Sequence, residues 1–295
     1  MTPTWFGPVA FKNPVFLASG ICGYGEEFSP LIDIRRLGGI VTKTITPRPR
    51  KGNPPPRIHE LPTGALNSIG LENVGLDVYV AEKLPKLARE NIDVIVSVAA
   101  EHIEEFEAIA GKLAPLEGYK GIELNLSCPN VEEKALDHGR NPAFVEKLTH
   151  AVRKRIADRA LLVKITPNVT DIGTVARAAE AGGADGISAI NTVLAIDFDL
   201  ATGKPVFFRE SGGYSGPGIL PVALQKVWEV AKAVSIPIMG IGGIGSIDDA
   251  RKFFLAGASA VQIGTALWQD PELPQRIVDA LETHPEWMRK GQVNS

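Results

Sequence analysis

The chain has 295 residues and is weakly acidic, with 34 Asp and Glu against 31 Lys and Arg, and 44% of its residues are hydrophobic. This composition is typical of a soluble globular protein, and a net charge of −3 argues against nucleic acid as a partner, because nucleic-acid binding requires clustered positive charge. We expect no membrane span, because no run of about 18 apolar residues is present. Two cysteines are too few for a disulfide framework or an iron–sulfur cluster, and together with an N-terminus unlike a signal peptide they predict a cytoplasmic protein.

Eight short runs along the chain are almost continuously hydrophobic, and each is bounded by Gly, Pro, Asn or Asp. Strands that are buried on both faces have this pattern, whereas strands with one face in water alternate between apolar and polar residues. The runs predict strands at residues 14–19, 38–44, 92–98, 121–127, 160–166, 185–190, 236–243 and 259–265.

Helical patterns fill most of the gaps between these strands, because apolar residues recur three and four positions apart. They predict helices over residues 74–90, 103–114, 142–157, 172–183, 221–234 and 247–258, and an amphipathic helix within 272–295. Pro85 predicts a kink in the first of these helices. Eight strand–helix alternations without a linker predict a single α/β domain over residues 1–295, folded as a (β/α)8 TIM barrel. An open, doubly wound sheet is the alternative.

Three connections are too long to serve only as links between elements. They are a Pro-rich segment at 45–75, a segment at 127–141 and a Gly-rich segment at 191–220. Long connections in compact domains are usually functional. Each follows a predicted strand, so on a barrel all three would cover the C-terminal face, where the active sites of such barrels lie.

A polar residue or a glycine stands at the end of every predicted strand. Because the carboxyl ends of all eight strands meet at one face of a barrel, these groups are expected to gather there. In chain order they are Ser19-Gly20, Lys43-Thr44, Ser97, Asn125 to Asn130, Lys164, Asn191-Thr192, Gly242-Gly243 and Gly264-Thr265.

The segment after the seventh strand reads Gly-Ile-Gly-Gly-Ile-Gly over residues 240–245, a formal match to a dinucleotide-binding motif. That interpretation needs an acidic residue at the end of the next strand, and Gly264-Thr265 stands there instead. We favour a cradle for a single phosphate, formed by backbone N–H groups of these glycines with the helix that starts near Ser246. Glycines that serve tight turns alone are the structural alternative.

Two lysines lie inside apolar runs. A buried ammonium group is costly unless an anion compensates it, so Lys43 and Lys164 each predict an anionic partner. A ring anion, a phosphate or a substrate carboxylate fits this requirement. An internal ion pair with a strand carboxylate such as Glu123 is the alternative.

Cys128 stands in the polar segment after the fourth strand, and a thiol with an ordinary pKa of about 8.5 can act as a general base. Cys22 lacks such neighbours and is interpreted as structural. The spacing of the five histidines matches no metal motif, so no metal site is predicted. His102, His150 and His284 fall on predicted helices and are expected at the surface.

Four asparagines stand at strand ends or in the long connections: Asn67, Asn125, Asn130 and Asn191. Amides offer both donors and acceptors, so several together suit a planar ligand whose edge alternates C=O and N–H groups, such as a pyrimidine. Turn formation, for which Asn is common, is the alternative at each position.

The chain resembles the dihydroorotate dehydrogenases of class one over residues 8–272. The stretches Asn125-Leu-Ser-Cys-Pro-Asn130 and Asn67-Ser-Ile-Gly-Leu-Glu-Asn73 are the most specific. Residues 18–25, 190–192, 212–216 and 264–265 also match. The stretch Gly52-Asn-Pro-Pro-Pro-Arg57 resembles the NAD-linked branch of the class more than the fumarate-linked branch.

The resemblance implies an FMN-containing barrel that oxidises dihydroorotate to orotate in pyrimidine biosynthesis. It makes Cys128 the base that removes the C5 proton while the C6 hydride passes to flavin N5, with Lys43 beside both flavin and substrate. Substrate contacts are implied for Lys43, Asn67, Ser68, Ile69, Gly70, Leu71, Asn125, Asn130, Asn191 and Thr192. Flavin contacts are implied for Ser19, Lys43, Thr44, Ser97, Asn125, Lys164, Ile190, Gly216, Gly242, Gly243, Gly264 and Thr265.

Two departures from the family pattern are Ser97, where Asn is common, and the segment after Thr192. The NAD-linked branch passes electrons through a second subunit that carries FAD and a 2Fe–2S cluster, so we expect such a partner as well as a homodimer. The alternatives are an oxidoreductase of another dihydropyrimidine such as dihydrouracil, a fumarate-linked enzyme, a Schiff-base aldolase that uses Lys164, and a flavin-binding barrel without dehydrogenase activity.

Overall fold

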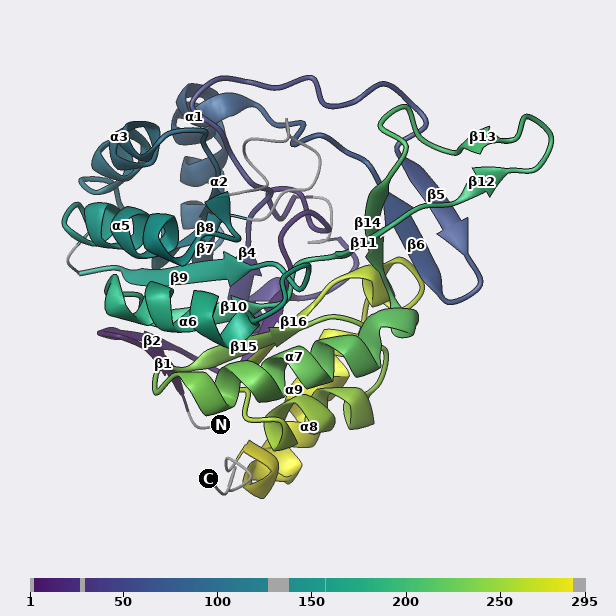
Figure 1. The fold of residues 1–295 in the computed structure, drawn as a ribbon. Coiled ribbons are helices and arrows are strands. Elements are labelled where there is room, and N and C mark those ends of the chain that lie inside the picture. Colours follow the sequence, from purple (N-terminus) through teal and green to yellow (C-terminus); the bar gives the residue numbers. More distant parts are fainter. Residues whose placement is uncertain (1–2, 27–29, 127–137, 157, 289–295) are drawn as a thin grey trace.

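The computed structural model describes residues 3–26, 30–126, 138–156 and 158–288. Eight parallel strands form a closed barrel in which each strand pairs with the next along the chain and the last pairs with the first (Figure 1). They are β3 (Val15–Leu17), β4 (Gly39–Val41), β7 (Val94–Val98), β8 (Gly121–Asn125), β9 (Ala160–Ile165), β10 (Gly186–Ala189), β15 (Ile238–Ile241) and β16 (Ala260–Ile263). The predicted barrel is therefore confirmed, and the open sheet is excluded by the β16–β3 pairing.

Helices surround the barrel on its outer side, where their apolar stripes pack on the strands (Figure 1). They are α1 (Gly75–Val78), α2 (Leu84–Arg89), α3 (Ile103–Leu113), α5 (Pro142–Arg153), α6 (Ile172–Ala181), α7 (Leu220–Ala233), α8 (Ile247–Leu255) and α9 (Leu273–Thr283). Side-chain caps fix the starts of α5, α6 and α8, where Asn141, Asp171 and Ser246 accept hydrogen bonds from the first turn. Four short 3-10 helices, η1 (Ile34–Arg36), η3 (Pro217–Ile219), η4 (Thr265–Trp268) and η5 (Pro285–Met288), complete the helical elements of the described ranges.

The helix predicted over residues 74–90 is divided rather than uniform. A π-helical turn, η2 (Tyr79–Lys83), separates α1 from α2, and Pro85 lies in the first turn of α2. A proline is tolerated in a first turn because its missing N–H group would have no partner there. The irregularity therefore falls just before Pro85. None of the helices in the described part of the chain is long and apolar enough to cross a bilayer.

A hairpin of β1 (Thr4–Phe6) and β2 (Val9–Phe11) closes the end of the barrel where the strands begin. Phe6 and Phe11 from the hairpin meet Phe16 of β3 in edge-to-face contacts, with ring centroids 5.2–6.4 Å apart. All three rings are fully buried against the barrel interior. Each buried ring contributes about 1.5–3 kcal/mol. With this end filled, the described residues leave the cavity of the barrel at the opposite end.

Two of the three long connections contain strands that the sequence did not indicate. Segments 45–75 and 191–220 supply an antiparallel sheet in the order β11 (Val193–Ala195), β14 (Gly212–Ser215), β6 (Gly64–Asn67) and β5 (Ile58–Leu61). A further hairpin joins β12 (Phe198–Asp199) to β13 (Lys204–Pro205). We call the part of the chain that contains this hairpin and the four-stranded sheet, residues 58–67 and 193–215, the arm. The arm projects to one side of the barrel (Figure 1). Most of the third connection, residues 127–137, lies outside the described residues.

Candidate active site at the carboxyl ends of the barrel strands

A cavity of about 290 Å³ opens at the carboxyl ends of the barrel strands. Its lining joins residues from all parts of the chain and is roofed on one side by the arm. Most of the residues predicted from the sequence take part in it: Ser19, Lys43, Thr44, Asn67, Ile69, Leu71, Asn125, Lys164, Ile190, Asn191, Thr192, Gly216, Gly242, Gly243, Gly264 and Thr265.

Three predicted contact residues stand behind the lining. Ser97 is fully buried, and its hydroxyl lies 2.9 Å from that of Thr44, so it supports Thr44 rather than facing the cavity. Ser68 is also buried and accepts a hydrogen bond from Asn53 at 3.0 Å. Gly70 packs so closely on Asn53 that a Cβ atom would lie 2.5 Å from its side-chain oxygen. Cys128 and Asn130 lie outside the described residues.

The end of the cavity at β15 and β16 has the form of a phosphate cradle. Gly242 and Gly243 follow β15 with φ of +127° and +76°, a backbone form that side chains rarely allow. A Cβ atom at Gly243 would lie 2.7 Å from the backbone nitrogen of Leu220. Helix α8 begins a few residues later behind its cap Ser246. Glycines that turn here expose N–H groups beside a helix start, which is the usual environment of a bound phosphate.

The two lysines have different surroundings. Lys43 is part-buried and forms an ion pair with Glu72 at 3.7 Å, and Arg57 holds the same carboxylate at 3.0 Å. The hydrogen bond from Arg57, together with the charge of Lys43, keeps the pKa of Glu72 below its ordinary value. The predicted alternative of an internal ion pair therefore applies to Lys43, with a loop carboxylate as its partner.

Lys164 of β9 is only 6% exposed and has no ion pair with any described residue. The alternative partner considered from the sequence, Glu123, lines the same cavity without contacting it as an ion pair. A buried ammonium group in this position is compensated best by an anionic or strongly polar ligand in the cavity.

A chain of hydrogen bonds holds the amides at the other end of the cavity. Asn191 donates to the Asn125 side-chain oxygen at 3.3 Å, and Asn125 donates to Thr44 at 3.0 Å. Asn67, from β6 of the arm, donates to the backbone oxygen of Gly213 at 3.1 Å. The Thr192 backbone N–H group donates to Asn191 at 2.8 Å. These bonds fix the amide orientations and so pre-form a polar surface for a planar ligand.

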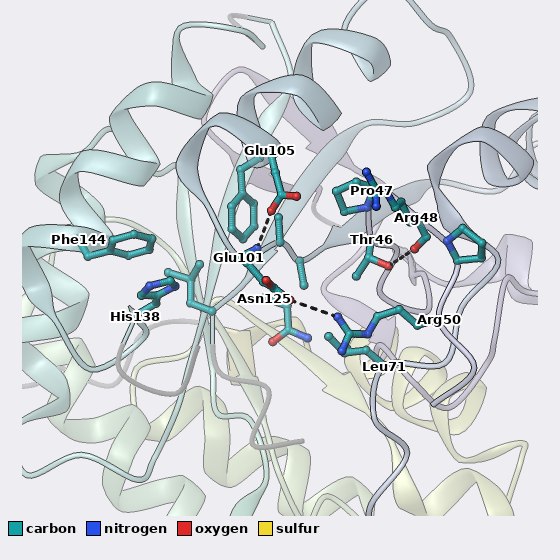
Figure 2. Close-up of a pocket in the computed structure, with 15 residues that line it drawn as sticks. Thr46, Pro47, Arg48, Arg50, Leu71, Glu101, Glu105, Asn125, His138 and Phe144 are labelled. Atoms are coloured by element: carbon teal, nitrogen blue, oxygen red, sulfur yellow. Dashed lines mark hydrogen bonds and ion pairs between the residues drawn. The ribbon is translucent and has the colours of Figure 1, made fainter. Parts of the chain in front are cut away.

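A second cavity of about 380 Å³ adjoins the first and shares Leu71 and Asn125 with it (Figure 2). Arg48 and Arg50 stand on one side of it, and Arg50 lies 3.7 Å from Glu101 across the opening. On the opposite wall His138 stacks on Phe144 with 4.1 Å between ring centroids. The charged approach to Asn125 from this side was not evident in the sequence, because it is built from segments 50 to 90 residues apart.

Several further lining residues had not been assigned to the site, among them Glu123 and Gln262 on the barrel strands and Trp268. The first two carried the signal that identified the lysines, because each is a polar residue inside a buried apolar run. Cys22 is buried, as predicted, and His102 and His150 are exposed. Within the described ranges no group of His, Cys, Asp and Glu is arranged to hold a metal ion.

Fold and cavity together define a class of protein, a (β/α)8 barrel whose mouth is lined by glycines at one end and by amide side chains at the other. A family model for dihydroorotate dehydrogenase matches residues 3–284. The chain therefore belongs to the dihydroorotate dehydrogenase family, which consists of flavin-dependent oxidoreductases. The resemblance noted in the sequence and the prediction of an oxidoreductase are both confirmed.

The relatives are similar over nearly their whole length. The chain is 47% identical to the dihydroorotate dehydrogenase B (NAD(+)) catalytic subunit of Solidesulfovibrio magneticus, covering 92% of this chain and 88% of that protein. It is 46% identical to the protein of the same name from Enterococcus faecalis OG1RF, covering 94% and 89%. A crystal structure of DHODH from Eimeria tenella in complex with ferulenol matches with a TM-score of 0.81 and 24% identity, covering 97% of this chain and 85% of that one, which supports the fold.

Proposed function

We propose that the chain, as one domain over residues 1–295, oxidises dihydroorotate to orotate in pyrimidine biosynthesis with FMN as its resident cofactor. The observation that carries this proposal is the division of one cavity into a glycine cradle, a buried lysine and an amide cluster. The glycine cradle suits the phosphate group of FMN, the buried lysine suits the polar flavin ring, and the amide cluster suits a pyrimidine beside that ring. The names of the relatives agree with this activity.

The glycine end fits the phosphate of FMN, since Gly242, Gly243, Gly264 and Thr265 all line it. The Thr265 hydroxyl donates a hydrogen bond to that of Ser215 at 2.9 Å, so the two side chains fix each other in this part of the lining. Ser19, Thr44, Ile190 and Gly216 extend the same lining, and Lys164 would face the flavin ring. When bound, the flavin supplies an acceptor for the hydride that leaves dihydroorotate.

The substrate end is built from Lys43, Asn67, Asn125, Asn191 and Thr192, which would bind the pyrimidine edge and its carboxylate. Ile69 and Leu71 close this end with apolar contacts. Lys43, already paired with Glu72, keeps a positive charge at the mouth for an anionic substrate. Cys128 would remove the C5 proton and Asn130 would hold the substrate, and both assignments derive from the sequence.

Replacing Gly243 with alanine should destabilise the protein by about 1–3 kcal/mol and release FMN, because a side chain is strained at its φ of +76° and meets the Leu220 backbone. Thermal unfolding and the flavin absorbance that remains after gel filtration measure the two effects. Gly111→Ala is the control, since its position on α3 is open and helical, and this change should leave FMN bound. Full retention of flavin by G243A would contradict the cradle.

We further propose that electrons leave through a partner subunit that carries FAD and a 2Fe–2S cluster and reduces NAD. The relatives are named catalytic subunits of an NAD(+)-linked enzyme, which implies a second subunit in those proteins. The two cysteines of this chain do not suffice for a cluster of its own. Copurification with a cysteine-rich flavoprotein would support the partner, whereas rapid NAD reduction by the isolated chain would refute it.

We propose a homodimer formed through the arm, whose described surface is unusually apolar. Leu200 is 98% and Phe208 is 74% exposed, and Leu194, Ile196 and Phe198 are about half exposed. A large apolar patch of this kind on a protein surface usually marks an interface, and a self-complementary patch gives a twofold dimer. The usage of cysteine further favours a cytoplasmic location.

The double change Leu200→Asp and Phe208→Asp should convert the dimer into a monomer, because it places two charges in the apolar contact. Sedimentation would show the mass falling from twice 31.6 kDa to 31.6 kDa. Leu255→Asp is the matched control, since Leu255 is also exposed but lies on α8, away from the arm. A wild-type chain that sediments as a monomer would refute the dimer.

The decisive test of the reaction is an anaerobic visible spectrum of the purified chain before and after dihydroorotate is added. We expect a flavin band that bleaches on addition. A band that bleaches with dihydrouracil and not with dihydroorotate would move the substrate to another dihydropyrimidine. No flavin band after FMN is supplied, with borohydride trapping of a substrate on Lys164, would support the aldolase instead.

A further inference from the structure

The floor of the cavity carries two polar side chains, one with a carboxylate and one with an amide, that the reaction outlined above does not use. Glu123 of β8 and Gln262 of β16 line the cavity from below and are 0% and 1% exposed. Glu123 precedes Asn125 by two residues, so both side chains point to the same face of β8, into the barrel. Lys164 of β9 lines the same floor and pairs in register with Asn125.

These two side chains are only partly hydrogen-bonded. Gln262 donates to one carboxylate oxygen of Glu123 at 3.1 Å. The other carboxylate oxygen, Oε1, and the amide oxygen of Gln262 are buried and have no hydrogen-bond partner in the described part of the chain. Two unused acceptors on the floor of a ligand cavity require a donor, because buried polar groups in proteins are almost always hydrogen-bonded.

Lys164, which lines the same floor, carries donors of the kind that these two acceptors require. Its ammonium group has three N–H bonds and no acceptor capacity, and none of them is used by an ion pair in the described chain. A purely structural role for Glu123 and Gln262 accounts poorly for the arrangement, because apolar side chains of similar size would fill the barrel without unpaired oxygens. The adjoining layer of the barrel is filled in that way by residues such as Phe16 and Leu162.

We propose that Glu123, held by Gln262, is the counter-charge and positioning residue of Lys164. The two acceptor oxygens receive the Lys164 ammonium group, directly or through one water. Glu123 thereby sets how much of the positive charge of Lys164 acts on the bound flavin. This extension rests on the proposed FMN site, since it concerns the charge beneath that ring, but the pairing itself does not require flavin.

The pairing is tested first on the full chain by a double-variant cycle of stability, with and without FMN. Glu123→Gln keeps the shape and removes the charge, and Lys164→Met keeps the length and removes the charge. If the two groups are counter-charges, each single change leaves the other charge buried alone. The double variant should then be less destabilised than the two single effects together predict, with an unfolding equilibrium constant about tenfold smaller than additivity gives. Additive effects in the protein without FMN would overturn the proposal.

The second measurement is the reduction potential of the bound flavin. E123Q removes a negative charge beneath the ring, so it should favour the reduced flavin by about tenfold, which is about 30 mV for a two-electron couple. E123Q should shift the potential by a different amount in the K164M background, because the charge that Glu123 offsets is then absent. An equal shift in both backgrounds would show that Glu123 does not act through Lys164.

Ser188→Ala is the matched control for both measurements. Ser188 of β10 is fully buried beside Lys164 in the strand register, and its hydroxyl has no partner in the described chain, yet it does not line the cavity and carries no charge. Its removal should leave the potential unchanged. A chain that binds no FMN would refute the proposed function, and the cycle without FMN would still decide on the pairing of Glu123 with Lys164.

Discussion

Replacing Cys128 with serine should slow the reduction of bound flavin by dihydroorotate about 10²–10⁴-fold at neutral pH, the usual contribution of a general base. A thiol has an ordinary pKa of about 8.5 and reaches its basic form near neutrality, whereas a hydroxyl does not. Stopped-flow absorbance of the flavin band measures this step alone, free of the steps that reoxidise the flavin. FMN should stay bound, because the change leaves the residues of the glycine cradle intact.

The control for this experiment is the other cysteine. Cys22 is fully buried, and its sulfur lies 4.0 Å from the Ala18 carbonyl and 3.9 Å from that of Val41. Cys22→Ala therefore removes a thiol from the core but does not alter the proposed base. The rate of flavin reduction should stay within a few-fold of wild type. Reduction at the wild-type rate in Cys128→Ser would place the base on another residue.

The barrel strands could be predicted from the sequence because their physics is local. A strand covered by helices on one side and by the barrel interior on the other must be hydrophobic on both faces, so runs such as 160–166 are recognisable by themselves. The long connections gave no such signal. Strands β6 and β14 have polar, Gly-rich sequences and are defined by pairing with each other about 150 residues apart.

The candidate site was predictable to the extent that burial contradicts residue type. Lys164 stood out because an ammonium group inside an apolar run needs compensation, and Gly243 because its turn needs a positive φ. Glu123 met the same criterion as Lys164 and was considered only as its partner. Ser97 was assigned to the cavity because it stands near a strand end, but the depth of a side chain within a barrel depends on the neighbouring strands, and here Thr44 lies above it.

Lysine 164 gives the second large effect: Lys164→Met should weaken FMN binding by about 10–100-fold. The estimate follows from the loss of one hydrogen bond to a charged group, about 1.5–3 kcal/mol, in a buried position. Methionine keeps the length and apolar contacts of the lysine stem, so the loss reports the ammonium group rather than a cavity. Quenching of flavin fluorescence during titration of the apoprotein gives the dissociation constant directly.

A charge change far from the cavity is the necessary comparison for this result. Lys252→Met removes an exposed lysine on α8 whose ammonium group lies 2.9 Å from Asp249, and it should leave the dissociation constant within a factor of two. Unaltered FMN binding in Lys164→Met would show that FMN does not pair with the ammonium group of Lys164. Glu123 alone would then compensate the buried charge of Lys164. A large loss in Lys164→Met with none in Lys252→Met requires that the flavin lie against the floor of the barrel, which is the geometry that hydride transfer from a substrate held by Asn125 and Asn191 demands.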